Sequence, residues 1–126
     1  MQHGIIYDTI PFMKIKLEIY HKADGSSPYE AWHDELDAQT ACRIDRAIFR
    51  MGDGNFAECK PIKNERVKGV FERVVDFGAG WRVYFGKDGD TVVVLLLGGK
   101  KKTQKRDIDK SLEYWSDYKK RKGGQK

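Results

Sequence analysis

Six consecutive apolar residues, Val92 to Leu97, constrain the fold of this chain more than any other feature. The run lacks the polar alternation of a half-buried strand and is far shorter than the roughly 20 residues of a membrane-spanning helix. It is typical of a β-strand covered on both faces, because such a strand needs no polar residues at alternate positions. The sequence therefore predicts a sheet with this strand at its centre and helices that cover it.

Three further segments have the pattern of strands. Met13 to Tyr20 alternates apolar with polar residues, as a half-buried strand does. Val70 to Phe77 and Trp81 to Phe85 flank a tight glycine-containing turn, and a second such turn precedes the apolar run. We therefore expect an antiparallel meander of three strands, which Gly98-Gly99 ends.

Helical spacing of apolar residues appears in three places. A short helix after the first strand has three such residues: Tyr29, Trp32 and Leu36. Asp37 can cap a second helix, and three apolar residues share one face of it: Ala41, Ile44 and Ile48. A last helix follows the lysine-rich stretch after Gly99, and its apolar stripe again has three members: Ile108, Leu112 and Trp115.

These elements predict an α+β domain with the order β-α-α-β-β-β-α. A mainly antiparallel four-stranded sheet is expected to pack against two N-terminal helices and a C-terminal helix. One domain should take in residues 1–126, with flexible termini at residues 1–11 and 123–126. The start of the chain lacks the basic and apolar stretches of a signal peptide, so we expect a cytoplasmic protein.

The charge is unevenly distributed along the chain. Residues 1–98 hold 13 basic and 15 acidic residues, whereas residues 99–126 hold 11 basic and 4 acidic ones. Such an excess indicates a polyanionic partner, and for a cytoplasmic domain nucleic acid is commoner than a membrane surface. A solvated helix with a basic tail has the same composition, so charge alone leaves both interpretations open.

The sequence contains no motif for a metal, a cofactor or an activated nucleophile. Cys42 and Cys59 form neither a disulfide framework nor a metal-binding spacing, and Cys42 is expected to be a small buried thiol in a helix. Gly78-Ala79-Gly80 is not followed by the helix that a dinucleotide site needs. We therefore expect no metal and no cofactor.

Two motifs, with the stretch Gly54 to Ile62, resemble a known family. Phe71 to Phe85 contains the pattern G-x-G-[aromatic]-R-V-Y-F, and Leu97 to Ile108 contains G-G-x-K-x-T-Q-x-[basic]-D-I. In order and separation these segments are similar to the phage-derived, HigB-like "addiction module killer" branch of the RelE/ParE toxins. The resemblance spans roughly residues 15 to 118. It implies the toxin of a type II toxin–antitoxin system, an mRNA interferase that inhibits translation.

The resemblance also implies which residues cleave RNA, since members of this superfamily use Lys, Arg and sometimes Tyr in the ribosomal decoding site. Arg82 and Tyr84 lie two apart on a strand, so they share one face, and a guanidinium can hold two phosphate oxygens. Arg73, on the adjacent strand, and Lys101, after the apolar strand, match basic residues of the family. We expect these four residues to be catalytic. A cross-strand ion pair with a carboxylate such as Glu72 is the structural alternative.

Other basic residues are expected to bind the RNA backbone: Lys60, Lys100, Lys102, Lys105 and Arg106. The histidines lie away from this region, so catalysis by histidine is not expected: His3, His21 and His33. Some relatives have a tyrosine or histidine at the start of the last helix, where this chain has Asp107 and Ile108. The general acid and base of the reaction therefore stay unassigned.

The implied partners are a cognate antitoxin protein, messenger RNA and the ribosome, with no membrane and with an oligomer possible through the antitoxin. Two other functions stay open. ParE-like members of the same superfamily poison DNA gyrase without cutting RNA. A catalytically inactive relative that binds nucleic acid is the second alternative, because the last helix lacks the tyrosine or histidine of some relatives.

Overall fold

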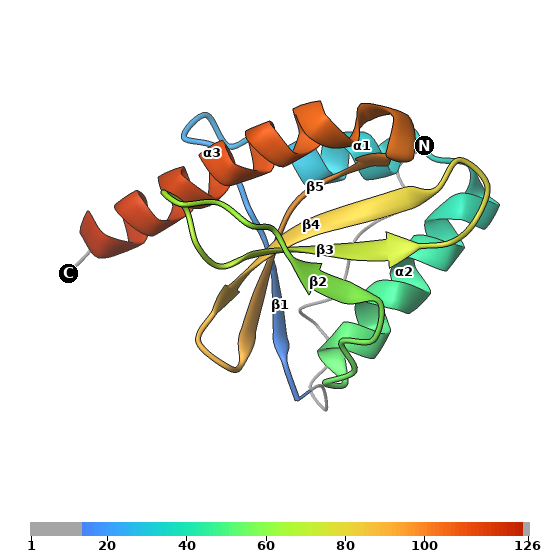
Figure 1. The fold of residues 1–126 in the computed structure, drawn as a ribbon, viewed down its shortest axis with the longest axis horizontal. Coiled ribbons are helices and arrows are strands. Elements are labelled where there is room, and N and C mark those ends of the chain that lie inside the picture. The colour runs from blue at the N-terminus through green and yellow to red at the C-terminus, as the bar shows by residue number, and fades with distance from the viewer. Residues whose placement is uncertain (1–13, 125–126) are drawn as a thin grey trace.

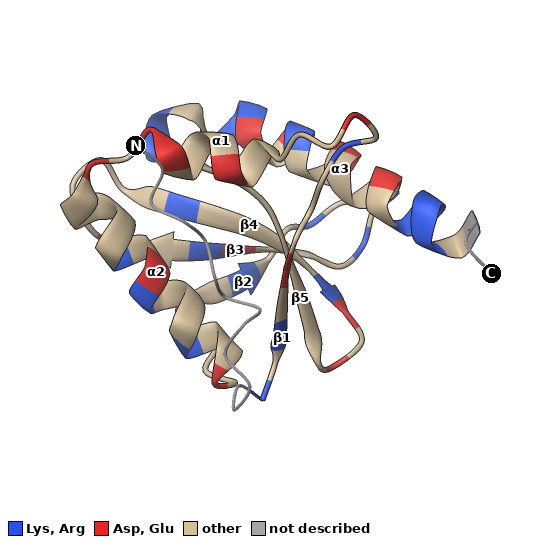
Figure 2. Ribbon diagram, turned by 180° about the vertical axis from the view of Figure 1, so that it is seen from behind, with Lys and Arg blue, Asp and Glu red and all other residues tan. Residues whose placement is uncertain are grey.

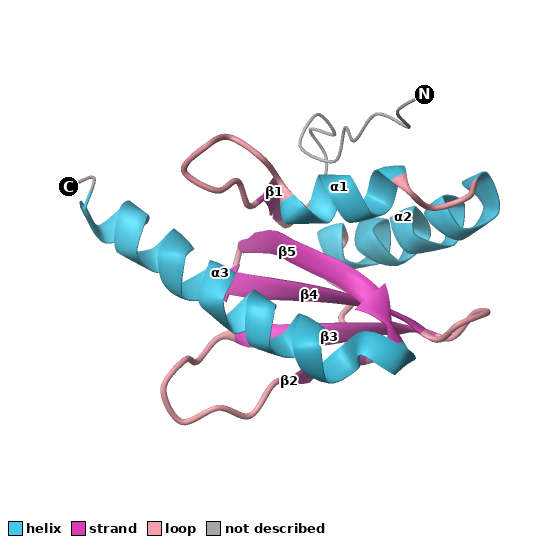
Figure 3. Ribbon diagram, turned by 90° about the horizontal axis from the view of Figure 1, so that it is seen from above, coloured by secondary structure: helices cyan, strands magenta, loops and turns pink. Residues whose placement is uncertain are grey.

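The computed structural model describes residues 14 to 124, so the predicted flexible termini lie wholly or partly outside it. Within these residues, five strands, three α-helices and a short 3₁₀ helix follow one another: β1 (Lys16–Ile19), α1 (Pro28–Asp34), α2 (Ala38–Gly52), β2 (Cys59–Pro61), β3 (Val70–Val75), β4 (Trp81–Asp88), β5 (Val92–Lys100), η2 (Lys101–Thr103) and α3 (Gln104–Gly124). Figures 1 and 3 show the sheet between α3 on one face and α1 with α2 on the other.

The sheet corrects the predicted fold class. It has five strands in the order β1-β5-β4-β3-β2, and β1 runs parallel to β5 while the other pairs are antiparallel. The prediction of a four-stranded, mainly antiparallel sheet is therefore wrong. The additional strand, β2, is three residues long and ends at Pro61, so it is too short for a period-two pattern. Alternation in β1 indicates a strand but does not encode the direction of its neighbour.

The apolar run lies in β5, which pairs with β1 on one side and β4 on the other. Val93 and Leu95 belong to the core under α1 and α2, whereas Val94 and Leu96 pack with Trp115 of α3. The prediction that this strand is covered on both faces is confirmed. The sheet thus separates two cores, and each side chain of β4 or β5 faces one or the other.

The glycine pair Gly98-Gly99 does not end the strand, contrary to the prediction, because β5 continues to Lys100. Both glycines are buried. A Cβ atom on Gly98 would overlap the Trp32 ring, and one on Gly99 would overlap the Asp107 carboxylate. Glycine at these positions lets α1 and the start of α3 approach the two faces of β5 closely.

Side chains cap the N-termini of both N-terminal helices, and Asp37 caps α2 as predicted. The Asp37 carboxylate accepts a hydrogen bond from the Thr40 amide at 2.7 Å, and the Ser27 hydroxyl accepts one from the Glu30 amide at 3.1 Å. Ala41, Ile44 and Ile48 of α2 are buried as expected. Cys42 is exposed instead, so its prediction as a buried thiol is wrong.

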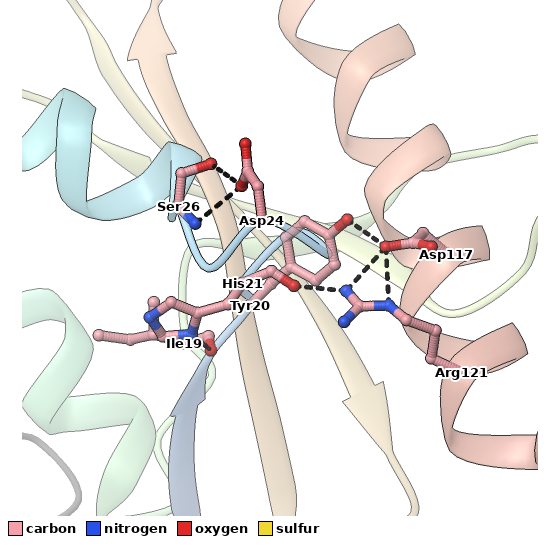
Figure 4. A network of polar contacts seen from close by, with 7 residues as sticks. All are labelled: Ile19, Tyr20, His21, Asp24, Ser26, Asp117 and Arg121. Atoms are coloured by element: carbon pink, nitrogen blue, oxygen red, sulfur yellow. Dashed lines mark hydrogen bonds and ion pairs between the residues drawn. The ribbon is translucent and has the colours of Figure 1, made fainter. Parts of the chain in front are cut away.

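The C-terminal half of α3 is fixed to the segment after β1 (Figure 4). The Tyr20 hydroxyl donates to Asp117 Oδ2 at 2.5 Å, and the Arg121 guanidinium donates to the same oxygen at 2.8 and 3.1 Å and to the His21 carbonyl. Burial, and then the bond to Asp117, raise the pKa of Tyr20 to about 12. The orientation of α3 across the sheet is therefore fixed at its far end. No helix within residues 14–124 has the length and apolar character needed to cross a membrane.

Replacing Gly86 by alanine is expected to destabilise the fold by about 1–3 kcal/mol, because a Cβ atom there would overlap the Trp115 ring. That ring is 2% exposed, and its Nε1 donates to the Lys68 carbonyl at 2.9 Å, so it has little freedom to move. Gly123→Ala is the control, since a Cβ there meets nothing within 4 Å. Urea unfolding of both variants checks this, and equal midpoints would contradict the packing.

Candidate functional site

A cluster of polar side chains lies between the sheet and the beginning of α3. Glu72 on β3 is paired with Tyr84 on β4, and Val74 on β3 is paired with Arg82 on β4. The side chains of Glu72, Tyr84 and Arg82 project to the α3 face of the sheet. Gln104 at the first position of α3 closes the cluster from above. Arg82 and Tyr84 share this face because they lie two apart on β4, as predicted, and the strand register adds Glu72 from β3.

Glu72 is the centre of this cluster and is fully buried. Its Oε1 accepts a hydrogen bond from Gln104 Nε2 at 2.7 Å and lies 3.7 Å from Arg82 Nε. Its Oε2 lies 3.8 Å from Lys60 Nζ and has no hydrogen-bond partner. A buried carboxylate of this kind is stabilised chiefly by its cationic neighbours. The sequence predicts Glu72 only as a possible ion-pair partner of the strand arginines. A charged residue at a core-facing strand position was the signal that could have identified it.

Arg82 and Lys101 meet at the carbonyl of Gly80. Arg82 Nη1 donates to this oxygen at 2.7 Å, and the Lys101 amide donates to it at 2.9 Å. Gly80 has a φ of +73°, and a Cβ on it would lie 3.3 Å from Lys101 Cβ and 3.4 Å from Arg82 Nη1. The turn between β3 and β4 therefore fixes the predicted arginine beside the predicted lysine. Only 11% of the Arg82 side chain is exposed, so a small part of it is open to a ligand.

Tyr84 lies on the same face but is fully buried, and its hydroxyl has no hydrogen-bond partner. Burial raises the pKa of Tyr84 well above its usual value, and the carboxylates of Glu72 and Asp107 raise it further, whereas Arg82 lowers it. The phenol therefore stays protonated at neutral pH. Because its ring is fully buried, Tyr84 presents no open ring face to a base.

Arg73 is not brought together with these residues. It is paired with Val83 on β4 and with Cys59 on β2, both of which belong to the core under α1 and α2. The Arg73 side chain is buried, and its Nη1 donates to the Val74 carbonyl at 2.6 Å. Arg73 and Arg82 therefore occupy opposite faces of the sheet, although they lie on adjacent strands.

The remaining predicted cations surround the start of α3 and are all exposed: Lys60, Lys100, Lys101, Lys102, Lys105 and Arg106. Lys101 and Lys102 belong to the 3₁₀ helix η2, so the expected loop is a helical turn. Beneath them the buried Asp107 accepts a hydrogen bond from Thr103 Oγ1 at 2.6 Å. A hollow of about 560 Å³ is lined here by seven residues: Lys102, Thr103, Lys105, Arg106, Asp109, Lys110 and Glu113.

No family model matches this chain. A protein of Haemophilus influenzae described as uncharacterized is 35% identical over 81 residues, which is 64% of this chain and 78% of that protein. The two proteins belong to one family. Membership of this family assigns no activity to the polar cluster or to the cations around it.

His21 and His33, the histidines among the described residues, lie outside the cluster. His33 is buried in α1, where its Nε2 lies 2.9 Å from Asp45 Oδ1, and His21 lies 3.3 Å from Glu30. His3 falls outside the described residues. Among residues 14–124, no group of three or more His, Cys, Asp or Glu side chains is arranged to hold a metal ion.

The two thiols of this family member are expected to react at different rates. Burial raises the pKa of Cys59 from 9.0 to about 11, which reduces its thiolate fraction at pH 8 about a hundredfold relative to an ordinary thiol. Cys42 is exposed. Titration with a chromogenic disulfide should therefore give one fast and one slow phase. Cys42→Ser should remove the fast phase and Cys59→Ser the slow one; the reverse assignment would contradict the burial of Cys59.

Proposed function

We propose that this chain is the toxin of a type II toxin–antitoxin pair of the RelE/ParE superfamily, and that it cleaves messenger RNA on the ribosome. The observation that supports this most directly is the junction at Gly80, where Arg82 and Lys101 share one carbonyl oxygen. A planar guanidinium and a lysine run at one edge of a sheet suit a phosphate group. The cleavage reaction itself is proposed from the motifs that resemble the HigB-like branch.

In this reaction the 2′-hydroxyl of one nucleotide gives up its proton and its oxygen bonds to the adjacent phosphorus. A 2′,3′-cyclic phosphate forms as the bond between phosphorus and the 5′-oxygen of the next nucleotide breaks, and that oxygen takes up a proton. Negative charge accumulates on the phosphate oxygens in the transition state, so a fixed cation accelerates the step. Arg82 provides this cation, and Glu72 with the Gly80 carbonyl hold its guanidinium in place. The lysines of η2 hold the RNA backbone beside it.

The proposed partners follow from this activity. A ribosome-directed nuclease acts in the cytoplasm and needs an antitoxin to protect the cell that makes it. The exposed cations at the start of α3 are complementary to acidic segments of such a protein, which would cover the site and prevent RNA from reaching Arg82.

A second candidate function, binding of nucleic acid without cleavage, is favoured by two observations. Tyr84 is fully buried, and Arg73 lies on the opposite face of the sheet. Of the four residues expected to be catalytic, Arg82 and Lys101 are the two that donate to one carbonyl oxygen, and Lys101 is exposed while Arg82 is largely buried. A site that binds a phosphate but lacks an acid and a base would hold RNA without cutting it.

A reconstituted cleavage assay separates the two candidates. Ribosomes programmed with a short messenger RNA and an empty decoding site are mixed with the purified chain, with and without a metal chelator. We expect cleavage within the decoding-site codon, products that end in a 2′,3′-cyclic phosphate, and no effect of the chelator. Ribosome binding without any product would support the second candidate instead.

A further inference from the structure

The loop between β2 and β3, residues 62–69, presents three cations in a part of the chain that has no overall basic excess. Lys63, Arg66 and Lys68 are all exposed, and within the described residues no carboxylate lies at ion-pairing distance from any of them. Residues 1–98 hold 13 basic and 15 acidic residues in total. Lys63, Arg66 and Lys68 nevertheless lie within six residues of one another, beside one carboxylate, Glu65.

The backbone of this loop is fixed to the rest of the molecule. Trp115 Nε1 of α3 donates a hydrogen bond to the Lys68 carbonyl at 2.9 Å, and the Lys87 amide of β4 donates one to the Gly69 carbonyl at 3.0 Å. Asn64 Oδ1 accepts hydrogen bonds from the amides of Arg66 and Val67, each at 2.9 Å. Two apolar residues of the loop pack on the core beneath α3: Ile62 and Val67. The loop therefore turns its apolar side chains inward and holds its cations outward.

The C-terminal half of α3 runs beside this loop (Figure 1) and carries further Lys and Arg residues (Figure 2). A hollow of about 800 Å³ is lined by residues 61–66 and 68–70, and a second hollow of about 420 Å³ lies between this loop and α3. The two share Lys68 and Gly69, and Lys119 of α3 lines the second. Lys119 Nζ lies 5.8 Å from the centre of the Trp115 ring, and no carboxylate of the described residues pairs with it.

We define the second basic surface as the four cations Lys63, Arg66, Lys68 and Lys119. It is separate from the cluster around Arg82. Arg82 lies near the start of β4, whereas the loop meets β4 at Lys87, five residues further on. At about 3.3 Å per residue in a strand, the two places are roughly 16 Å apart. One extended nucleic-acid strand could therefore reach both.

We propose that the second basic surface binds the phosphate backbone of RNA, as a contact additional to the site around Arg82. This rests on the proposed function in taking RNA as the ligand. A protein partner would need apolar anchors at the centre of the surface, but Ile62 and Val67 face inward. Exposed Lys and Arg side chains that have no carboxylate partner are suited to binding phosphate groups. Such binding has no sequence preference and depends strongly on the salt concentration.

The test measures binding of a fluorescent, unstructured RNA oligonucleotide to the full chain over a range of salt concentrations. The triple variant K63Q/R66Q/K68Q should weaken binding on the order of tenfold and reduce the salt slope by about 2, since each single-strand phosphate contact contributes about 0.7. K119Q should also reduce the salt slope, by about 0.7, which corresponds to one phosphate contact. The control R43Q/R46Q/R50Q removes equal charge from α2 on the opposite face and should leave the slope unchanged.

The outcomes separate this inference from the proposed function. If the triple variant and its control have equal salt slopes, or if the parent chain does not bind the oligonucleotide, the second basic surface is not an RNA site. This result would stand even where messenger RNA is cleaved in an Arg82-dependent manner. If the triple variant loses affinity for poly-glutamate but not for RNA, the ligand of the second basic surface is an acidic protein and the inference is wrong. If the triple variant has a smaller salt slope but the parent chain cleaves no messenger RNA, the second basic surface binds RNA and the proposed nuclease function is wrong.

Discussion

Replacing Arg82 by alanine is expected to reduce the rate of messenger RNA cleavage on the order of a hundred- to a thousandfold, which corresponds to about 3–4 kcal/mol. The reason is that a charge-assisted contact to the phosphate, realised mainly in the transition state, is lost. Binding to the ribosome should change much less, because the exposed lysines of η2 remain. Single-turnover cleavage on programmed ribosomes, with binding measured in parallel, checks this prediction.

Arg82→Lys is the matched control, because it keeps the charge and loses the planar grip on two oxygens. A phosphate-holding role predicts a substantial loss of rate for this variant, whereas a general surface charge predicts almost none. Replacing one of Lys100, Lys101 and Lys102 should cost less than Arg82→Ala, since its neighbours can substitute for it. Replacing all three should weaken both binding and cleavage. Full activity in both Arg82 variants would show that the proposed site is wrong.

Replacing Glu72 by alanine is expected to destabilise the fold by about 3–5 kcal/mol, because it leaves the guanidinium of Arg82 largely buried without its carboxylate. The Gln104 amide also loses its acceptor. The double variant Glu72→Gln/Arg82→Met removes both charges and should recover much of this loss. Urea unfolding of the single and double variants measures the difference.

An exposed ion pair gives the comparison for this prediction. Glu18 lies 3.2 Å from Lys16 Nζ, and the two side chains are 33% and 65% exposed. Glu18→Ala should therefore cost less than about 1 kcal/mol. If Glu72→Ala and Glu18→Ala have equally small effects, the pair of Glu72 with Arg82 does not hold the site together.

The parts of the fold that follow from periodicity could be predicted from the sequence. Val92 to Leu97 has a continuous apolar pattern because β5 is covered on both faces, and Asp37 caps α2 because its carboxylate reaches the Thr40 amide. Strand direction and very short strands could not be predicted. The pairing of β1 with β5 connects segments far apart in the chain, and β2 has three residues.

The site could be predicted in part for a related reason. Residues two apart on one strand share a face whatever the neighbouring strands do, so Arg82 and Tyr84 were placed together. The face of Arg73 depends on the register across the β3–β4 turn, which pairs it with Val83. The burial of Tyr84 depends on α3, and packing of this kind is not encoded in strand periodicity.

Mapping of messenger RNA ends in cells that produce the chain tests the central claim most directly. We predict new 5′ ends within translated regions soon after induction, their loss when Arg82 is replaced by alanine, and relief of growth arrest when the cognate antitoxin is produced as well. Gyrase-linked DNA breaks, mapped in the same cultures, should not increase. Growth arrest with gyrase-linked breaks and with unchanged messenger RNA ends would contradict the account and make the chain a gyrase poison.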